Sequence, residues 1–205
     1  MRFSVAIDIE TVKGFLDPVE GEALHQSCLQ VAPMGAVLEV GSYCGKSTIY
    51  LGDACRKVGV TLFAVDHHRG SEEHQPGEEY HDVSLFDTDA GVMDSFREFR
   101  HNMRRAGLED TVVPVVAPSA VASRNWNTPL SMVFIDGGHS LEAALTDYRA
   151  WTRHLLPGGL LAIHDIFPDP AEGGQAPYDI YKLALASGQF VEEPRVKTLG
   201  LLRRI

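Results

Sequence analysis

Two short stretches of the sequence combine carboxylates with histidine in a pattern suited to proton transfer and metal binding. They read FIDGGHS over 134–140 and AIHDIF over 162–167. Each begins with apolar residues that predict a buried strand, and neighbouring strands lie about 5 Å apart. Asp136 and Asp165 could therefore supply two oxygen ligands to Mg²⁺, which prefers oxygen and keeps several waters. His139 lies at the same predicted edge, where a neutral imidazole could take the proton from a hydroxyl group.

A second candidate site is the loop in VLEVGSYCGKSTIY, over 37–50. Its end, Gly45-Lys46-Ser47-Thr48, is like that of a P-loop. A P-loop has four residues between its first glycine and the Gly-Lys-Ser/Thr, so that backbone amides wrap the phosphates. Only three residues separate Gly41 from Gly45 here. The length argues against a P-loop, and Lys46 is predicted to be an exposed residue in the first turn of the following helix.

Two acids near this loop indicate what it could bind. Glu39 stands two positions before Gly41, and Asp66 ends the next predicted strand. A carboxylate at that strand end can accept hydrogen bonds from ribose hydroxyls, whereas Glu39 would repel a pyrophosphate. The spacing G-x-x-x-G also differs from the G-x-G-x-x-G of dinucleotide-binding folds. The pattern therefore favours a ligand that has a ribose and no phosphate.

The run EVGSYCG, over 39–45, resembles the first motif of class I S-adenosylmethionine-dependent methyltransferases, E/D-x-G-x-x-x-G. The resemblance covers most of 17–205 and implies that S-adenosylmethionine is the cofactor. It also implies that the cofactor contacts residues of this loop and of the following strand ends. The residues so implied are Glu39, Gly41, Ser42, Gly45, Ser47, Asp66, His67, Ser119 and Asp136.

The run DGGH, over 136–139, followed by an acid at the next strand end, resembles metal-dependent O-methyltransferases of the Methyltransf_24 type. The resemblance implies that Asp136, Asp165 and His164 bind Mg²⁺ and that His139 is the catalytic base. These relatives usually have Glu at the position of His164. Because imidazole is a softer ligand than carboxylate, the identity of the metal and the need for it stay open. The alternative for Asp136 and Asp165 is that they only cap turns or helix ends, and the alternative for His139 is a structural role.

The resemblance implies an enzyme that transfers a methyl group to a hydroxyl of a sugar or oligosaccharide. The chain is similar to the methyltransferases of mycobacterial methylmannose polysaccharide synthesis, which implies the 1-hydroxyl of a mannoside as acceptor. Alternative acceptors are a catechol or other phenolic hydroxyl and a macrolide sugar. A non-catalytic module that binds S-adenosylmethionine is a further alternative, although binding alone would not require Asp136, His139 and Asp165 together.

Strands that alternate with helices predict a doubly wound, Rossmann-like α/β fold. We expect a seven-stranded sheet that is mostly parallel and has an antiparallel last strand. Helices are predicted over 17–33, 47–58, 92–106, 141–155 and 178–186, with the run PGG ending the fourth. Strands are predicted over 37–40, 60–66, 111–117, 131–139 and 160–165, and two more over 189–205 are joined around Pro194. Pro114 indicates an edge strand.

We expect one domain over 1–205, with an N-terminal helical segment over 1–33. The stretch 67–91 is too long for an ordinary strand-to-helix connection of about two to six residues. It is either a lid over the substrate or a solvated loop. Its histidines, His67, His68, His74 and His81, fit no standard metal site, so we expect them to be solvated.

Composition restricts the possible partners. The formal net charge of −10 argues against a nucleic-acid or membrane-surface binder. Three cysteines without a CxxC pair predict neither a disulfide framework nor a zinc site, and they favour a reducing cytoplasm. The acceptor site would form from 67–91, 166–177 and the N-terminal segment. Small methyltransferases of this type often complete that site with a partner subunit, so a homodimer is expected.

Overall fold

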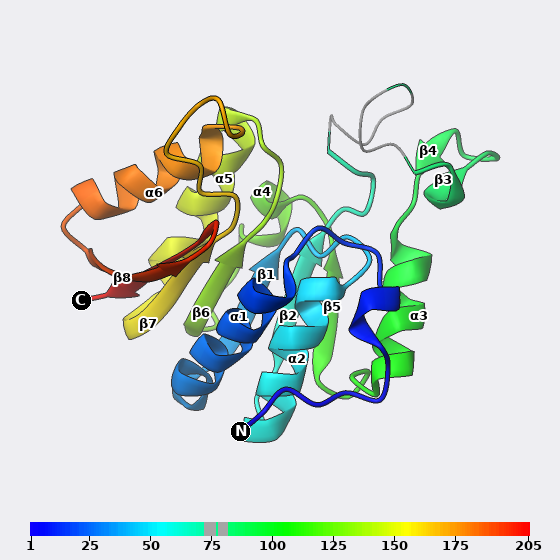
Figure 1. The fold of residues 1–205 in the computed structure, drawn as a ribbon, viewed down its shortest axis with the longest axis horizontal. Helices are drawn as coiled ribbons and strands as arrows, with labels where there is room; N and C mark the ends of the chain where they lie inside the picture. The colour runs from blue at the N-terminus through cyan, green and yellow to red at the C-terminus, as the bar shows by residue number, and fades with distance from the viewer. Residues whose placement is uncertain (72–76, 78–81) are drawn as a thin grey trace.

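A seven-stranded sheet forms the centre of the protein, in a computed structural model that describes residues 1–71, 77 and 82–205. Its strands are β1 (Ala36–Val40), β2 (Leu62–Asp66), β5 (Val112–Val116), β6 (Leu130–Ile135), β7 (Leu155–Ile163), β8 (Phe190–Val196) and β9 (Leu199–Arg204). Their order is β5-β2-β1-β6-β7-β9-β8 (Figure 1). The first five in this order are parallel, and β9 is antiparallel to both of its neighbours. The predicted α/β fold with an antiparallel last strand is confirmed.

Helices cover both faces of the sheet, because successive strand side chains point to opposite faces. The α-helices are α1 (Pro18–Val31), α2 (Lys46–Val58), α3 (Phe96–Ala106), α4 (Ser119–Ala122), α5 (Leu141–Trp151) and α6 (Ala176–Ala186). Short 3-10 helices are η1 (Ile9–Thr11), η2 (Ala32–Met34), η4 (Val83–Leu85) and η5 (Thr152–His154). α1, α2 and α3 pack on the face that carries Val37 and Phe134 (Figure 1). α5 and α6 pack on the opposite face, against Leu38 and Val133.

The register of three neighbouring strands brings their carboxyl ends to the same level. Val40 pairs with Ile135, and Ile135 pairs with Ile163. The chain order also reverses at β1, since β2 and β5 lie on one side and β6 and β7 on the other. Ligands of open α/β sheets bind at the strand ends beside such a reversal. The residues that directly follow β1, β6 and β7 therefore share the edge where a ligand is expected.

Two predicted boundaries were wrong. The helix predicted over 92–106 begins only at Phe96, because residues 92–93 form β4 and pair with β3 (Phe86–Asp87). The run PGG does not separate a helix from a strand, because β7 begins at Leu155 and contains that run. Side chains of β9 hold this segment in the sheet. Arg204 Nη1 donates to the Leu155 carbonyl at 2.7 Å, and Arg203 Nη1 donates to the Gly158 carbonyl at 2.8 Å.

The two prolines in strands lie where the sheet can accept them. Pro114 is in β5, at one edge of the sheet, as predicted. The predicted turn around Pro194 was wrong, because Pro194 lies inside β8 at the other edge. Edge strands tolerate proline because not every backbone N–H there has a partner strand. The chain turns instead at Lys197, whose positive φ of 50° begins the return into β9.

Two further features of the described residues concern the cysteines and the length of the helices. All three cysteines are free and buried, which agrees with the absence of a disulfide framework. Within 1–71, 77 and 82–205, no helix has both the length and the apolar character needed to cross a lipid bilayer.

A buried carboxylate ties the N-terminal segment to α1 and α2. Asp53 is fully buried, and its oxygens accept from Ser4 N at 3.1 Å and Arg56 Nη2 at 2.7 Å. They also face His25 Nε2 at 3.0 Å and accept from Lys57 Nζ. In Figure 1 the N-terminal segment, in dark blue, passes the C-terminal end of α2, runs beside α3 and then returns to the start of α1. This path depends on the Asp53 cluster at its beginning.

Replacing Asp53 should weaken the fold. Asp53→Asn should lower the free energy of unfolding by about 2 kcal/mol, because the buried side chain loses one acceptor oxygen while Ser4 N and the partly exposed Arg56 and Lys57 still point donors at it. Urea denaturation followed by circular dichroism measures this change. The matched control is Asp179→Asn, which removes an exposed pair with Lys182 and should change stability by less than about 1 kcal/mol. Equal effects of the two substitutions would contradict the assigned role of Asp53.

Candidate active site

Three side chains meet at the carboxyl ends of β6 and β7. One ligand atom each from Asp136, His139 and Asp165 lies within 4.8 Å of the others. His139 Nε2 is 3.1 Å from Asp165 Oδ2, and these two side chains are 35% and 25% exposed. The predicted convergence of the two acids with His139 is therefore present. The group is accessible to a substrate while its members remain in contact with one another.

His164 lies behind this group. Its side chain is 5% exposed, and its Nδ1 is 3.2 Å from Asp136 Oδ1 and 3.4 Å from Asp165 Oδ1. Its Nε2 is 3.1 Å from Glu20 Oε2. Both ring nitrogens thus face carboxylates. The ring contacts Asp136 and Asp165 from the buried side of the site, where it can orient them.

The charges in this group stabilise one another. Burial opposes ionisation of Asp165, but hydrogen bonds from His139 and His164 outweigh burial and hold the pKa of Asp165 well below its ordinary value. Burial likewise disfavours the cationic form of His164. The carboxylates of Asp136, Asp165 and Glu20 outweigh it and raise the pKa of His164 far above its ordinary value. A buried cation therefore sits between three acids.

Backbone strain is concentrated around the same edge. Among the described residues, the non-glycine residues with positive φ are Tyr43, His68, Asp165 and Lys197. The first three follow β1, β2 and β7, and Lys197 lies in the turn that precedes β9. Such conformations persist where surrounding contacts impose them, and they cluster at functional sites.

The glycine loop after β1 packs against the acid cluster. Gly41 has a φ of 86°, and a Cβ there would lie 2.0 Å from the Asp136 carbonyl oxygen. Asp66 holds the next part of the loop, because its Oδ2 accepts from Ser42 N at 2.9 Å and Tyr43 N at 2.8 Å. The other oxygen accepts from His68 N at 2.7 Å. A carboxylate has about four acceptor positions, so Asp66 retains capacity for a further donor.

Glu39 supports this loop from inside the protein. It is fully buried and accepts from Ser47 Oγ at 2.6 Å and Thr48 Oγ1 at 2.5 Å. Burial raises the pKa of Glu39 from 4.5 to about 7, although the two hydroxyls favour its charged form. Glu39 and Ser47 thus fix the first turn of α2 to β1. Ser42 Oγ is buried and has no hydrogen-bond partner among the described residues.

The other predicted cofactor residues lie at the ends of β2 and β5. His67 is exposed, and its Nδ1 accepts from Arg69 N at 3.0 Å. Ser119 is buried, and its Oγ accepts from Trp151 Nε1 at 3.1 Å. Beside it, burial raises the pKa of Asp147 from 3.8 to about 6, against a hydrogen bond from Ser119. The sequence analysis did not identify Asp147. Its spacing from Ala144 and Ala150 in α5 is the only pattern in the sequence that could have indicated its burial.

Two local predictions were wrong. Lys46 is buried rather than exposed, because the segment around Gly14 covers it and its Nζ lies 3.4 Å from Glu10 Oε2. His68 is buried rather than solvated. Its Nδ1 is 2.9 Å from Ser95 Oγ, and its ring contacts Phe96 and Phe99. His74, His81 and most of the predicted lid between them lie outside the described residues.

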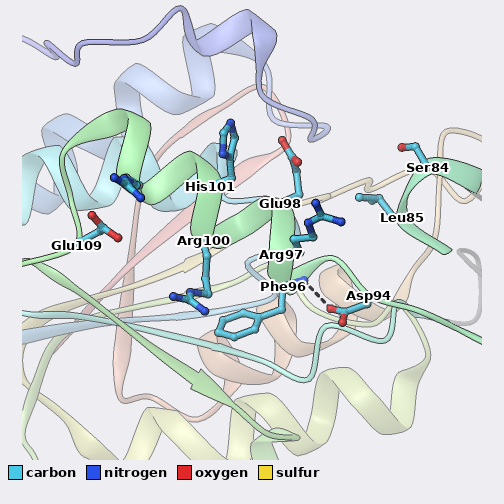
Figure 2. A pocket seen from close by; sticks show the side chains of 10 residues that line it. Ser84, Leu85, Asp94, Phe96, Arg97, Glu98, Arg100, His101 and Glu109 are labelled. Carbon is cyan, nitrogen blue, oxygen red and sulfur yellow. Dashed lines mark hydrogen bonds between the residues drawn. The ribbon is translucent and has the colours of Figure 1, made fainter. Parts of the chain in front are cut away.

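The described structure has two hollows of interest, one beside α3 and one at the cluster of Asp136, His139 and Asp165. A hollow of about 660 Å³ opens on the outer face of α3, where Figure 2 shows side chains spread around the helix. Its charged lining is balanced between three arginines and three acids, and it contains no member of the cluster. A much smaller hollow of about 10 Å³ is lined by Asp136, His139 and His164 together with Pro177 and Ile180 of α6. Its size suits about one water. Location and chemistry favour the cluster as the active site.

Stability should depend on pH through Glu39. The folded state keeps the Glu39 proton up to about pH 7, whereas the unfolded chain releases it near 4.5. Stability should therefore fall as pH rises through this window, by roughly 3 kcal/mol from this residue. Glu39→Gln should lack that part of the fall, as measured by urea denaturation between pH 4 and 8. The exposed control Glu142→Gln should follow the wild type, and a slope unchanged by Glu39→Gln would contradict the assignment.

Comparison with known proteins agrees with this location. The model of the Methyltransf_24 family, described as a methyltransferase domain, matches residues 38–166. The O-methyltransferase NovP is 18% identical, with a TM-score of 0.68, over 90% of this chain and 79% of NovP. An O-methyltransferase from Bacillus cereus, in complex with SAH, is 17% identical with a TM-score of 0.61, over 95% and 86%. TomG from Streptomyces achromogenes, in complex with SAM, is 14% identical with a TM-score of 0.58, over 92% and 79%.

The matched region begins in β1 and ends just after β7, so it contains the glycine loop, Asp66 and the acid cluster. The solved structures share the fold over most of the chain. The chain therefore belongs to the Methyltransf_24 family of methyltransferases.

Proposed function

We propose that this methyltransferase transfers the methyl group of S-adenosylmethionine to a hydroxyl group, at the edge where β1, β2, β6 and β7 end. The observation that carries the proposal is the contact between Gly41 and Asp136. Because of this contact, the glycine loop lies directly beside the cluster of His139 and Asp165. A methyl donor in the loop and an acceptor at the cluster would lie next to each other. In-line positioning is the main requirement for transfer from an activated donor.

The loop fits the proposed donor. Gly41 and Gly45 have positive φ, which permits close approach of the backbone to a ligand. We assign Asp66 to the ribose hydroxyls and Ser119, with His67 nearby, to the adenine side. The cited relatives from B. cereus and S. achromogenes hold SAH and SAM. Glu39 and Ser47 contribute by fixing the loop.

We assign His139 as the base. An alkyl hydroxyl is a poor nucleophile near neutral pH and needs a base, a metal ion or both. The tautomer that carries its proton on Nε2 donates to Asp165 Oδ2, 3.1 Å away, and keeps Nδ1 basic. As the acceptor oxygen forms its bond to the methyl carbon, Nδ1 takes the hydroxyl proton. Asp165 stabilises the imidazolium that results.

The cluster also fits a divalent metal ion. Asp136 and Asp165 offer hard oxygen donors, and His139 lies within reach of the same point. The two carboxylates suit Mg²⁺ or Mn²⁺, with waters in the remaining positions, and His139 keeps its role as the base. When bound, the ion would make the acceptor hydroxyl more acidic. His164 faces carboxylates with both nitrogens, so we assign it an orienting role.

For the acceptor we propose a sugar or oligosaccharide hydroxyl, with the 1-hydroxyl of a mannoside as the first compound to test. A phenolic hydroxyl is a second candidate, and one observation favours it. Phe15 is 64% exposed, and its ring lies 6.0 Å from that of Tyr43 in the cofactor loop. Aromatic faces stack on aromatic acceptors. A homodimer that completes the acceptor site remains part of the proposal.

A transfer assay with labelled S-adenosylmethionine tests this function. Mannosides, macrolide sugars and catechols are supplied in turn, with Mg²⁺, with Mn²⁺ and with EDTA. Transfer to one acceptor class identifies the substrate, and loss of transfer in EDTA supports the metal assignment. Binding of S-adenosylmethionine without transfer to any hydroxyl would favour a non-catalytic module instead.

The base has its own test. His139→Ala should lower kcat by at least ~10²-fold, because the hydroxyl proton loses its acceptor. The affinity for S-adenosylmethionine should stay within about threefold of wild type, since the assigned cofactor contacts are elsewhere. His101→Ala, at an exposed position of α3, is the matched control. An unchanged kcat in His139→Ala would remove His139 as the base.

A further inference from the structure

A buried glutamate on the first turn of α1 reaches the candidate active site. Glu20 is 3% exposed. Its Oε1 accepts from Thr198 N at 2.8 Å and Thr198 Oγ1 at 2.7 Å. Its Oε2 is 3.1 Å from His164 Nε2, across 144 positions of sequence. One carboxylate thus joins α1, the turn between β8 and β9, and the end of β7.

The ring of His164 carries this contact on to the acid cluster. With Nε2 directed at Glu20, Nδ1 lies 3.2 Å from Asp136 Oδ1 and 3.4 Å from Asp165 Oδ1. An imidazole bound at both nitrogens cannot turn without losing a hydrogen bond to a buried acid. The orientation of the ring, and with it that of both carboxylates, therefore depends on Glu20.

The turn that binds Glu20 also holds the backbone beside the cluster. Ile166 N donates to the Thr198 carbonyl at 2.9 Å, one residue after Asp165. Asp165 has a φ of 58°, a conformation that its surroundings must maintain. Glu20 therefore acts on Asp165 by two routes, through the ring of His164 and through the turn at Thr198.

We propose that Glu20 is a positioning residue for the reaction, a role that rests on the proposed function. It fixes the ring of His164 so that Asp136 and Asp165 stay aligned with His139 and with the cofactor loop. Outer partners that orient metal ligands or catalytic groups commonly account for 10–100-fold in affinity or activity. The N-terminal helix, which lies outside the region matched by the family, would then be part of the active site.

Three variants separate positioning from general stability. Glu20→Ala removes both contacts. Glu20→Gln keeps one side-chain oxygen that can accept from the protonated His164 Nε2, so it should restore the orientation of the ring. Glu22→Ala, two residues along the same helix at an exposed position, is the matched control. Each variant is measured for kcat, KM, Mn²⁺ affinity and SAH affinity.

Glu20→Ala should lower kcat and Mn²⁺ affinity by at least ~10-fold while SAH affinity stays within about threefold. Glu20→Gln should recover most of the loss, and Glu22→Ala should match the wild type. A kcat and Mn²⁺ affinity for Glu20→Ala within twofold of wild type would overturn the proposal. An equal loss of SAH affinity would also overturn it, because the effect would then belong to the fold as a whole.

A spectroscopic measurement keeps this test separate from the proposed function. The Nε2–H signal of His164 in ¹⁵N–¹H spectra, identified by its loss in His164→Gln and by its coupling to both carbon-bound ring protons, should be protected from solvent exchange by Glu20. It should persist in Glu20→Gln and disappear in Glu20→Ala. If the wild type transfers no methyl group, the proposed function fails, and this signal still decides the role of Glu20. If Glu20→Ala does not fold, Glu20→Asp replaces it, and a wild-type signal and kcat there would contradict the proposal.

Discussion

The active-site edge depends on the shared register of β1, β6 and β7. Because Val40, Ile135 and Ile163 are paired across the three strands, the chain leaves all of them at the same level. Gly41 and Asp136 then come into direct contact, at a distance that leaves no room for a side chain on Gly41. A slip of one residue in β6 would exchange the side chains that it buries on the two faces of the sheet and carry Asp136 away from the loop. The chemistry at this edge therefore requires the buried, close-packed sheet beneath it.

Buried carboxylates connect this edge to the rest of the protein. Burying a charge is unfavourable unless other groups compensate it, so each such acid must keep its partners. Asp53 holds the N-terminal segment, Glu39 holds the start of α2, and Glu20 holds His164. The net charge of −10 thus includes acids that organise the interior as well as acids that face solvent.

Sequence patterns predicted the features that depend on local spacing. The alternation of strands and helices predicted the layered α/β architecture. The spacing of the glycines over 41–45 indicated that this loop is not a P-loop. Apolar runs predicted that Asp136 and Asp165 lie at the ends of strands. Contacts between distant residues were not predictable in this way. Glu20 contacts His164 across 144 positions of sequence, and no local pattern marks either residue for the other.

The incorrect predictions have the same cause. His68 looked like a solvated residue, but Ser95 and two rings of α3, Phe96 and Phe99, contact and bury it. The run PGG looked like a boundary, but arginines of β9 donate to the carbonyls of Leu155 and Gly158 and keep the run within β7. In both cases a tertiary partner overrides the local tendency of the sequence.

Calorimetric titration with SAH, on the wild type and Asp66→Asn with and without Mn²⁺, is the decisive measurement for the cofactor site. The account predicts binding by the wild type in both conditions, because no metal ligand is assigned to the cofactor's ribose or adenine. It predicts weaker binding by Asp66→Asn, because the ribose loses an ionised acceptor. No binding of SAH to the wild type would contradict the assignment of the glycine loop, and equal affinities for the two proteins would contradict the role of Asp66.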